Sequence, residues 1–143
     1  MSNFRTFDLN GNEVTSAYFN DKKVTLIFVW ATYCGYCRDE MPTLQKLDEE
    51  YKDFGVLGVC VDLLDRKDNI DAKQLKKAKS IVEKIGLEAP SVLPVASMQK
   101  LLANATSLPY GVFVDSEGNQ LGIGFYGLQK EERLRASIDR YLN

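Results

Sequence analysis

The chain has 143 residues, of which 45% are hydrophobic, and a formal net charge of −2 at pH 7. This length and composition predict one globular domain over residues 1–143. The net charge excludes a broad basic surface for nucleic acid. The chain also has no run of about 18 apolar residues that could span a bilayer, and no secretory apolar segment near its start.

The first half of the chain predicts two strands, a hairpin and a helix. Residues 7–14 carry an Asn-Gly turn signal between short extended pieces, which predicts an N-terminal hairpin. Residues 24–30 and 56–61 are continuous apolar runs and predict buried strands. Between them, a helix should begin near Cys34 and end near Lys52, because apolar residues recur there at helical spacing, namely Met41, Leu44, Leu47 and Tyr51.

The second half predicts three helices and a hairpin. Apolar residues from Leu75 to Ile85 mark an amphipathic helix that Gly86 ends, and a shorter helix is expected around residues 98–102. Residues 111–114 and 121–125 flank a turn and should pair antiparallel, followed by a closing helix over about 131–142. With a right-handed parallel crossover earlier in the chain, this order predicts an α/β fold whose mixed sheet has helices on both faces.

The cysteines carry the most specific chemical signal. The chain has no histidine, which excludes Ser-His-Asp and Cys-His catalysis. Cys34 and Cys37 form a Cys-x-x-Cys motif at a predicted strand-to-helix junction, where unpaired N–H groups and the helix dipole favour a thiolate. Cys34 is therefore the expected nucleophile, and Cys37, one turn later on the same face, is the expected resolving thiol.

A Cys-x-x-Cys pair is also half of many zinc sites. A zinc site would need two further ligands from carboxylates or from Cys60, which lies in a predicted buried strand and is interpreted as a core residue. We therefore expect no metal and no cofactor other than the redox-active disulfide of the motif itself.

Two prolines have alternative interpretations. Pro42 lies inside the predicted helix, where it should bend the axis, unless the helix begins only after it. Pro109 directly precedes a predicted strand, and spacing alone favours a trans bond because only about 5–6% of X-Pro bonds in folded proteins are cis.

Residues 28–42, with the sequence FVWATYCGYCRDEMP, resemble the active-site stretch of the TlpA/ResA-like branch of the thioredoxin superfamily. The similarity extends to the N-terminal hairpin, to an inserted helix around residues 73–85, and to a cis-proline loop and hairpin over 108–118. The resemblance implies a thioredoxin fold with an N-terminal β-hairpin and an inserted helix, and it covers nearly the whole chain.

The resemblance also implies a function. This branch contains membrane-tethered or secreted thiol–disulfide oxidoreductases, often reductants in cytochrome c maturation. It implies a protein disulfide substrate, an upstream thiol electron donor, an extracytoplasmic location with a leader or anchor outside this chain, and a monomer. By position, Glu40 is the acidic residue beside the cysteines, with a solvated helix residue as the alternative. Pro109 is the cis-proline that receives the substrate backbone, and the further substrate-binding residues are Trp30, Tyr33, Gly35, Tyr36 and Leu108.

Three positions depart from the family pattern. Phe28 stands where thioredoxins proper have a buried Asp, so the proton transfer of cytosolic thioredoxin is not expected here. Tyr33 replaces the usual Trp, and Leu108 stands where a β-branched residue is more common.

Two other functions are alternatives to an oxidoreductase. A peroxiredoxin-like peroxidase would need Thr three positions before its cysteine, where this chain has Ala31, with Thr32 one place off. A redox-inert peptide-binding domain is the other alternative, and the presence of both cysteines argues against it.

Overall fold

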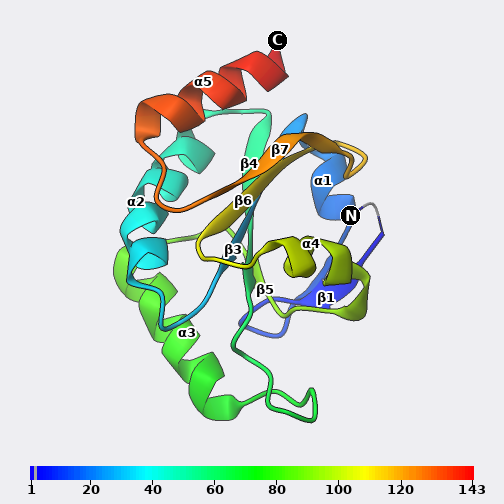
Figure 1. The fold of residues 1–143 in the computed structure, drawn as a ribbon, viewed down its shortest axis with the longest axis vertical. Coiled ribbons are helices and arrows are strands. Elements are labelled where there is room, and N and C mark those ends of the chain that lie inside the picture. The colour runs from blue at the N-terminus through cyan, green and yellow to red at the C-terminus, as the bar shows by residue number, and fades with distance from the viewer. Residues whose placement is uncertain (2) are drawn as a thin grey trace.

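The centre of the molecule is a five-stranded mixed sheet, shown in Figure 1. The structure, a computed structural model, describes Met1 and residues 3–143. The strand order is β5-β4-β3-β6-β7, in which β3 pairs parallel with β4 and antiparallel with β6. The strands are β3 (Val24–Trp30), β4 (Phe54–Cys60), β5 (Ser91–Val92), β6 (Tyr110–Asp115) and β7 (Gln120–Tyr126).

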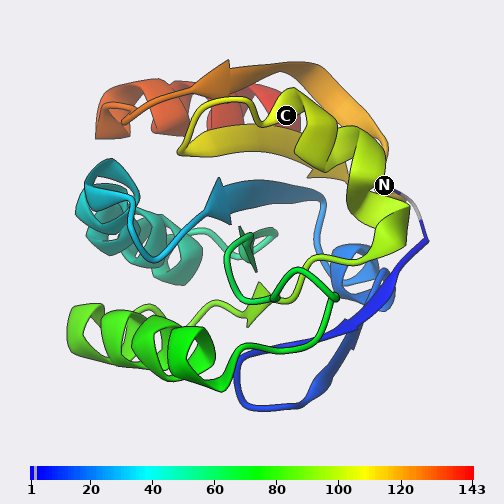
Figure 2. The same cartoon turned by 60° about the horizontal axis from the view of Figure 1, so that its bottom comes forward.

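Helices cover both faces of this sheet. Every residue of β3 and β4 is buried, as expected for central strands that are covered on both sides. Successive β3 side chains alternate between two hydrophobic clusters, one against the helices of one face and one against those of the other. In Figure 2 the first face carries α2 (Gly35–Glu50), α3 (Ala72–Ile85) and α5 (Glu131–Leu142), and the second carries α1 (Ala17–Asn20), η1 (Ala96–Met98) and α4 (Gln99–Asn104).

The N-terminal hairpin of β1 (Arg5–Phe7) and β2 (Glu13–Thr15) is antiparallel and forms a separate small sheet. In its turn, the Asp8 carboxylate accepts hydrogen bonds from the backbone N–H groups of Asn10 and Asn12, and Gly11 has a φ of 83°. The Thr6 hydroxyl donates to the carbonyl of Leu93 at 2.7 Å. The hairpin is thus attached beside β5 rather than lying free.

The helix ends follow from local chemistry. The Asp71 side chain accepts the N–H groups of Lys73 and Gln74 at the start of α3, and Gly86 ends that helix with a φ of 85° in the left-handed region. Helix α2 begins seven residues before Pro42, so the alternative that it starts after this proline is wrong.

The predicted fold is confirmed, including the mixed sheet, the N-terminal hairpin and the helix over 72–85. Sequence periodicity missed the four-residue helix α1 and the two-residue strand β5, which are too short to show a period. Within the described residues, the helices are too short or too polar to cross a membrane.

Candidate active site

Cys34 lies between β3 and α2 and is the N-cap residue of α2. Cys34 and Cys37 are joined by a disulfide, with their Cα atoms 5.3 Å apart. The backbone N–H of Cys37 donates to the Cys34 sulfur at 3.2 Å, so the helix N-terminus faces this sulfur. Cys34 is 8% exposed and Cys37 is fully buried. A substrate from solvent therefore reaches Cys34 first.

A polar network holds the segment that leads into Cys34. The Asp62 carboxylate accepts hydrogen bonds from the backbone N–H of Thr32 at 3.0 Å and from its hydroxyl at 2.5 Å. The side-chain amide of Gln74 on α3 also donates to Asp62, at 3.0 Å. On the other side, the Arg38 guanidinium donates to the carbonyl of Thr32 at 2.7 Å. Hydrogen bonds thus connect the segment to the loop after β4, to α2 and to α3.

Asp62 was not predicted from the sequence. It lies two residues after the end of β4, whereas the reactive segment begins at the end of β3, and the two strands are parallel neighbours. The carboxyl ends of parallel strands meet at one edge of a sheet, where functional side chains gather. That rule, applied to the two predicted strands, would have placed Asp62 beside the cysteines.

The aromatic residues around the motif have different roles. Tyr33 and Tyr36 are 71% and 66% exposed, and Gly35 between them is also exposed, so all three are accessible to a partner. Trp30 is fully buried, and its indole N–H donates to the Ser91 hydroxyl at 3.1 Å. The prediction that Trp30 contacts substrate is therefore corrected, because its side chain belongs to the core under the site.

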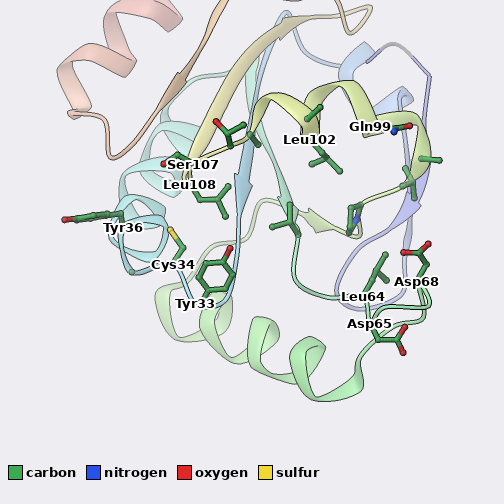
Figure 3. A pocket seen from close by; sticks show the side chains of 18 residues that line it. Tyr33, Cys34, Tyr36, Leu64, Asp65, Asp68, Gln99, Leu102, Ser107 and Leu108 are labelled. Atoms are coloured by element: carbon green, nitrogen blue, oxygen red, sulfur yellow. The ribbon is translucent and has the colours of Figure 1, made fainter.

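The loop before β6 reaches the same surface as Cys34. Its Leu108–Pro109 peptide bond is cis, as the family resemblance implied. Leu108 and Ser107 line a groove with a volume of about 1080 Å³, together with Tyr33, Cys34 and Tyr36, as Figure 3 shows. Pro109 itself is buried, and its carbonyl accepts the N–H of Gly127 at 2.9 Å. The loop thus has a fixed conformation next to Cys34, the more accessible of the two cysteines.

Glu40 is a buried carboxyl group, one helical turn after Cys37 on α2, and is 3% exposed. Burial raises its pKa to about 7, and the hydrogen bond that its Oε2 accepts from the N–H of Gln129, at 2.7 Å, acts in the opposite direction. The alternative of a solvated surface acid is wrong. Phe28, which replaces the Asp of thioredoxins proper, packs in the same apolar cluster as Cys37.

Cys60 is buried and unbonded to another cysteine, as expected for a core residue. Its thiol donates to the Asp62 carboxylate at 3.3 Å. Burial, and then the negative charge of Asp62, raise the pKa of Cys60. This thiol is therefore held in its unreactive neutral form. The described part of the chain has no cluster of three Cys, Asp or Glu residues that could hold a metal ion.

Comparison with known proteins identifies the family. The model of the AhpC/TSA family matches residues 1–138. The chain belongs to this family. Within the curated proteins, it is 28% identical over 140 residues to the thiol–disulfide oxidoreductase ResA of Bacillus thuringiensis, a match that covers 96% of this chain and 74% of ResA.

Two solved structures share the fold across almost the whole chain. One is a thiol:disulfide interchange protein of the DsbE type from Chlorobium tepidum, with a TM-score of 0.78 and 20% identity over 99% of this chain and 94% of that one. The other is a secreted disulfide oxidoreductase of Mycobacterium tuberculosis, with a TM-score of 0.73 and 17% identity over 96% and 95% of the two chains. The TlpA/ResA-like resemblance and the thioredoxin fold are confirmed, and so is a thiol–disulfide oxidoreductase built on Cys34 and Cys37.

Proposed function

We propose that this AhpC/TSA family member reduces disulfides of protein substrates, with Cys34 as the nucleophile and Cys37 as the resolving thiol. The observation that carries this proposal is the difference between the two sulfurs. Cys34 caps the helix and keeps 8% of its surface exposed, whereas Cys37 is fully buried. Only Cys34 is available for attack on a large substrate, and only an intramolecular attack is available to Cys37.

Reduction of the substrate disulfide takes two thiol–disulfide exchange steps. The Cys34 thiolate attacks one sulfur of the substrate disulfide, and the other substrate sulfur leaves as a thiolate and takes a proton. The Cys37 thiol then loses its proton and attacks the Cys34 sulfur, which releases the second substrate cysteine. The substrate gains two electrons and two protons, and the protein ends with the Cys34–Cys37 disulfide of the structure.

The N-terminus of α2 favours the first step. Because the N–H of Cys37 already points at the Cys34 sulfur, at 3.2 Å, a thiolate there receives a charge-assisted hydrogen bond without rearrangement of the helix. The Asp62 network supports this arrangement by fixing the segment before Cys34.

Glu40 is proposed as the acceptor of the Cys37 proton in the second step. A group with a pKa of about 7 is suited to both taking and returning a proton at neutral pH. The chain has no histidine for this task, and Phe28 fills the position of the usual buried Asp with an apolar ring. The hydrogen bond from Gln129 holds the Glu40 carboxyl group in place.

The substrate is proposed to bind across Tyr33, Gly35 and Tyr36 on one side, and Leu108 and Pro109 on the other. Tyr33, Gly35, Tyr36 and Leu108 line one groove with Cys34. An upstream thiol protein then returns the two electrons. The similarity to the secreted mycobacterial oxidoreductase supports an extracytoplasmic location. The process is proposed to be cytochrome c maturation or redox homeostasis, as the TlpA/ResA-like resemblance implies. We propose that the protein works as a monomer without a further cofactor.

The proposal is tested by reduction of insulin with dithiothreitol as the electron donor, measured as precipitation of the released chain. The wild-type protein should accelerate precipitation, and the Cys34→Ser variant should not. Hydrogen peroxide consumption is the matched control for a peroxidase. Ala31 stands where a peroxidatic site needs Thr, and the Thr32 hydroxyl is bonded to Asp62, so we expect no peroxide consumption. Peroxide turnover without insulin reduction would overturn the proposal.

A further inference from the structure

The groove beside Cys34 has two chemically different ends. Tyr33, Cys34 and Tyr36 line one end, and the loop that follows β4 forms the other, where Figure 3 shows Asp65 and Asp68. Its volume of about 1080 Å³ is at the upper end of the range of about 300–1,000 Å³ that is typical of ligand pockets. The groove therefore has room for several residues of an extended peptide, and not only for a disulfide.

Much of the groove lining is apolar. Val61, Leu64, Val95, Leu102 and Leu108 contribute to it, from the loop after β4, from α4 and from the segments before and after α4. Apolar lining with a few polar groups at fixed points is the usual character of a binding site. The groove would therefore accept apolar side chains, and a small number of polar groups would determine which substrate binds.

All charged residues that line the groove are acidic, namely Asp65 and Asp68. The Asp65 Oδ1 atom accepts the backbone N–H groups of Lys67 and Asn69, which fixes the loop. Among the described residues, neither aspartate forms a salt bridge. Arg66 and Lys67 lie between them in sequence and are exposed, but they do not line the groove. Both aspartates can thus pair with a cation from a bound partner.

We propose that Asp65 and Asp68 are specificity-determining residues that bind a lysine or arginine of the substrate, in an extended peptide segment that lies along the groove with its cysteine at Cys34. Two observations support a basic peptide as the ligand. The groove is continuous with the reactive disulfide, and the charge at its far end is complementary to a basic side chain. This inference rests on the proposed function, because the peptide must present a disulfide to Cys34.

The test uses the full chain, reduced with dithiothreitol that is then removed. The substrates are short peptides whose single cysteine carries a neutral thiopyridyl group in disulfide linkage. The Cys34 thiolate attacks the peptide sulfur, the sulfur–sulfur bond to the thiopyridyl group breaks, and pyridinethione leaves with the electron pair and a proton. Cys37 then releases the peptide as a thiol and forms the Cys34–Cys37 disulfide. The absorbance of pyridinethione gives the second-order rate constant.

A single lysine, or a glutamine in its place, is moved one position at a time along both sides of the cysteine. At the spacing that reaches the aspartates, the lysine peptide should react about fivefold faster than its glutamine counterpart, a small factor because exposed ion pairs are weak. The advantage should decrease at high salt. It should also disappear in the Asp65→Asn, Asp68→Asn double variant.

The substitutions preserve the loop. An asparagine at 65 retains the oxygen that accepts the two N–H groups, and an asparagine at 68 tolerates the φ of 61° found there. The charge-matched control is Asp53→Asn with Glu132→Gln, two exposed residues outside the groove, of which Asp53 lies at the opposite end of β4. This control separates local pairing from the effect of net charge.

Two results would overturn the inference while leaving the proposed function intact. One is equal rates for lysine and glutamine peptides at all spacings. The other is a lysine advantage that persists in the groove variant or falls equally in the control. Failure to react with any peptide would instead overturn the proposed function, and this inference with it.

Discussion

Replacement of Glu40 by glutamine should make the stability of the protein less dependent on pH. The pKa of Glu40 is raised from 4.5 to about 7 by burial. Between pH 4.5 and about pH 7 the Glu40 carboxyl group is protonated in the folded protein and ionised in the unfolded chain. The folded state is therefore stabilised at low pH, and this stabilisation decreases as the pH rises. The stabilisation is fully present below pH 4.5 and is lost as the pH passes through 7.

The size of the effect follows from the same shift. At 1.36 kcal/mol for each pH unit, ionisation of the buried carboxyl group costs about 3 kcal/mol of folding free energy above pH 7. Glutamine keeps an oxygen to accept the N–H of Gln129 and cannot ionise. At pH 5 the unfolded-state carboxyl is already mostly ionised, so part of this effect is present at that pH. Relative to wild type, the stability of Glu40→Gln should therefore increase by about 2.5 kcal/mol between pH 5 and pH 8, or roughly 10 °C in Tm for a chain of this size.

Urea unfolding of the oxidised protein at pH 5 and pH 8 measures this difference. Any cost of burying the amide group appears at both pH values and cancels in the comparison. Glu132→Gln, at an exposed site on α5, is the matched control and should show no such gain. If the stability of Glu40→Gln and of wild type changes in parallel with pH, the burial argument for Glu40 is refuted.

Three further predictions concern the site. Asp62→Asn should destabilise the protein by about 2 kcal/mol, because the carboxylate accepts hydrogen bonds from Thr32, Cys60 and Gln74. Urea unfolding at pH 7 measures this change, and an unchanged midpoint would show that these hydrogen bonds do not stabilise the fold. Glu40→Gln should slow the release of a mixed disulfide in single-turnover reactions near pH 7, because Cys37 loses its proposed proton acceptor, and unchanged release rates would remove this role. Pro109→Ala should reduce peptide capture by Cys34 in a gel-shift assay, whereas undiminished capture would exclude this loop from substrate binding.

The sequence predicted the large elements because their patterns are long. The strand over residues 24–30 matches β3 residue for residue, and the second strand differs from β4 by two residues at its start and one at its end. Elements of two to four residues, α1 and β5, carry no measurable period, so only tertiary contacts define them.

The parts of the site that depend on neighbouring residues could be predicted from the sequence, whereas contacts between distant segments could not. The position of Cys34 at a helix start follows from the order of a strand and a helix. The Glu40 carboxyl group accepts a hydrogen bond from Gln129, 89 residues later, and Thr32 is bonded to Asp62 and Gln74. No short window of sequence contains either arrangement. Trp30 was misassigned for the same reason, since its partner Ser91 lies 61 residues away.

The most direct test of the central account is the trapping of mixed disulfides. Cys37→Ser and Cys34→Ser variants are each incubated with a disulfide-containing protein, and the covalent complexes are separated on non-reducing gels. Because Cys34 is the accessible sulfur and Cys37 is fully buried, Cys37→Ser should accumulate a complex through Cys34, and Cys34→Ser should accumulate none. Accumulation through Cys37 in the Cys34→Ser variant would contradict the assignment of nucleophile and resolving thiol.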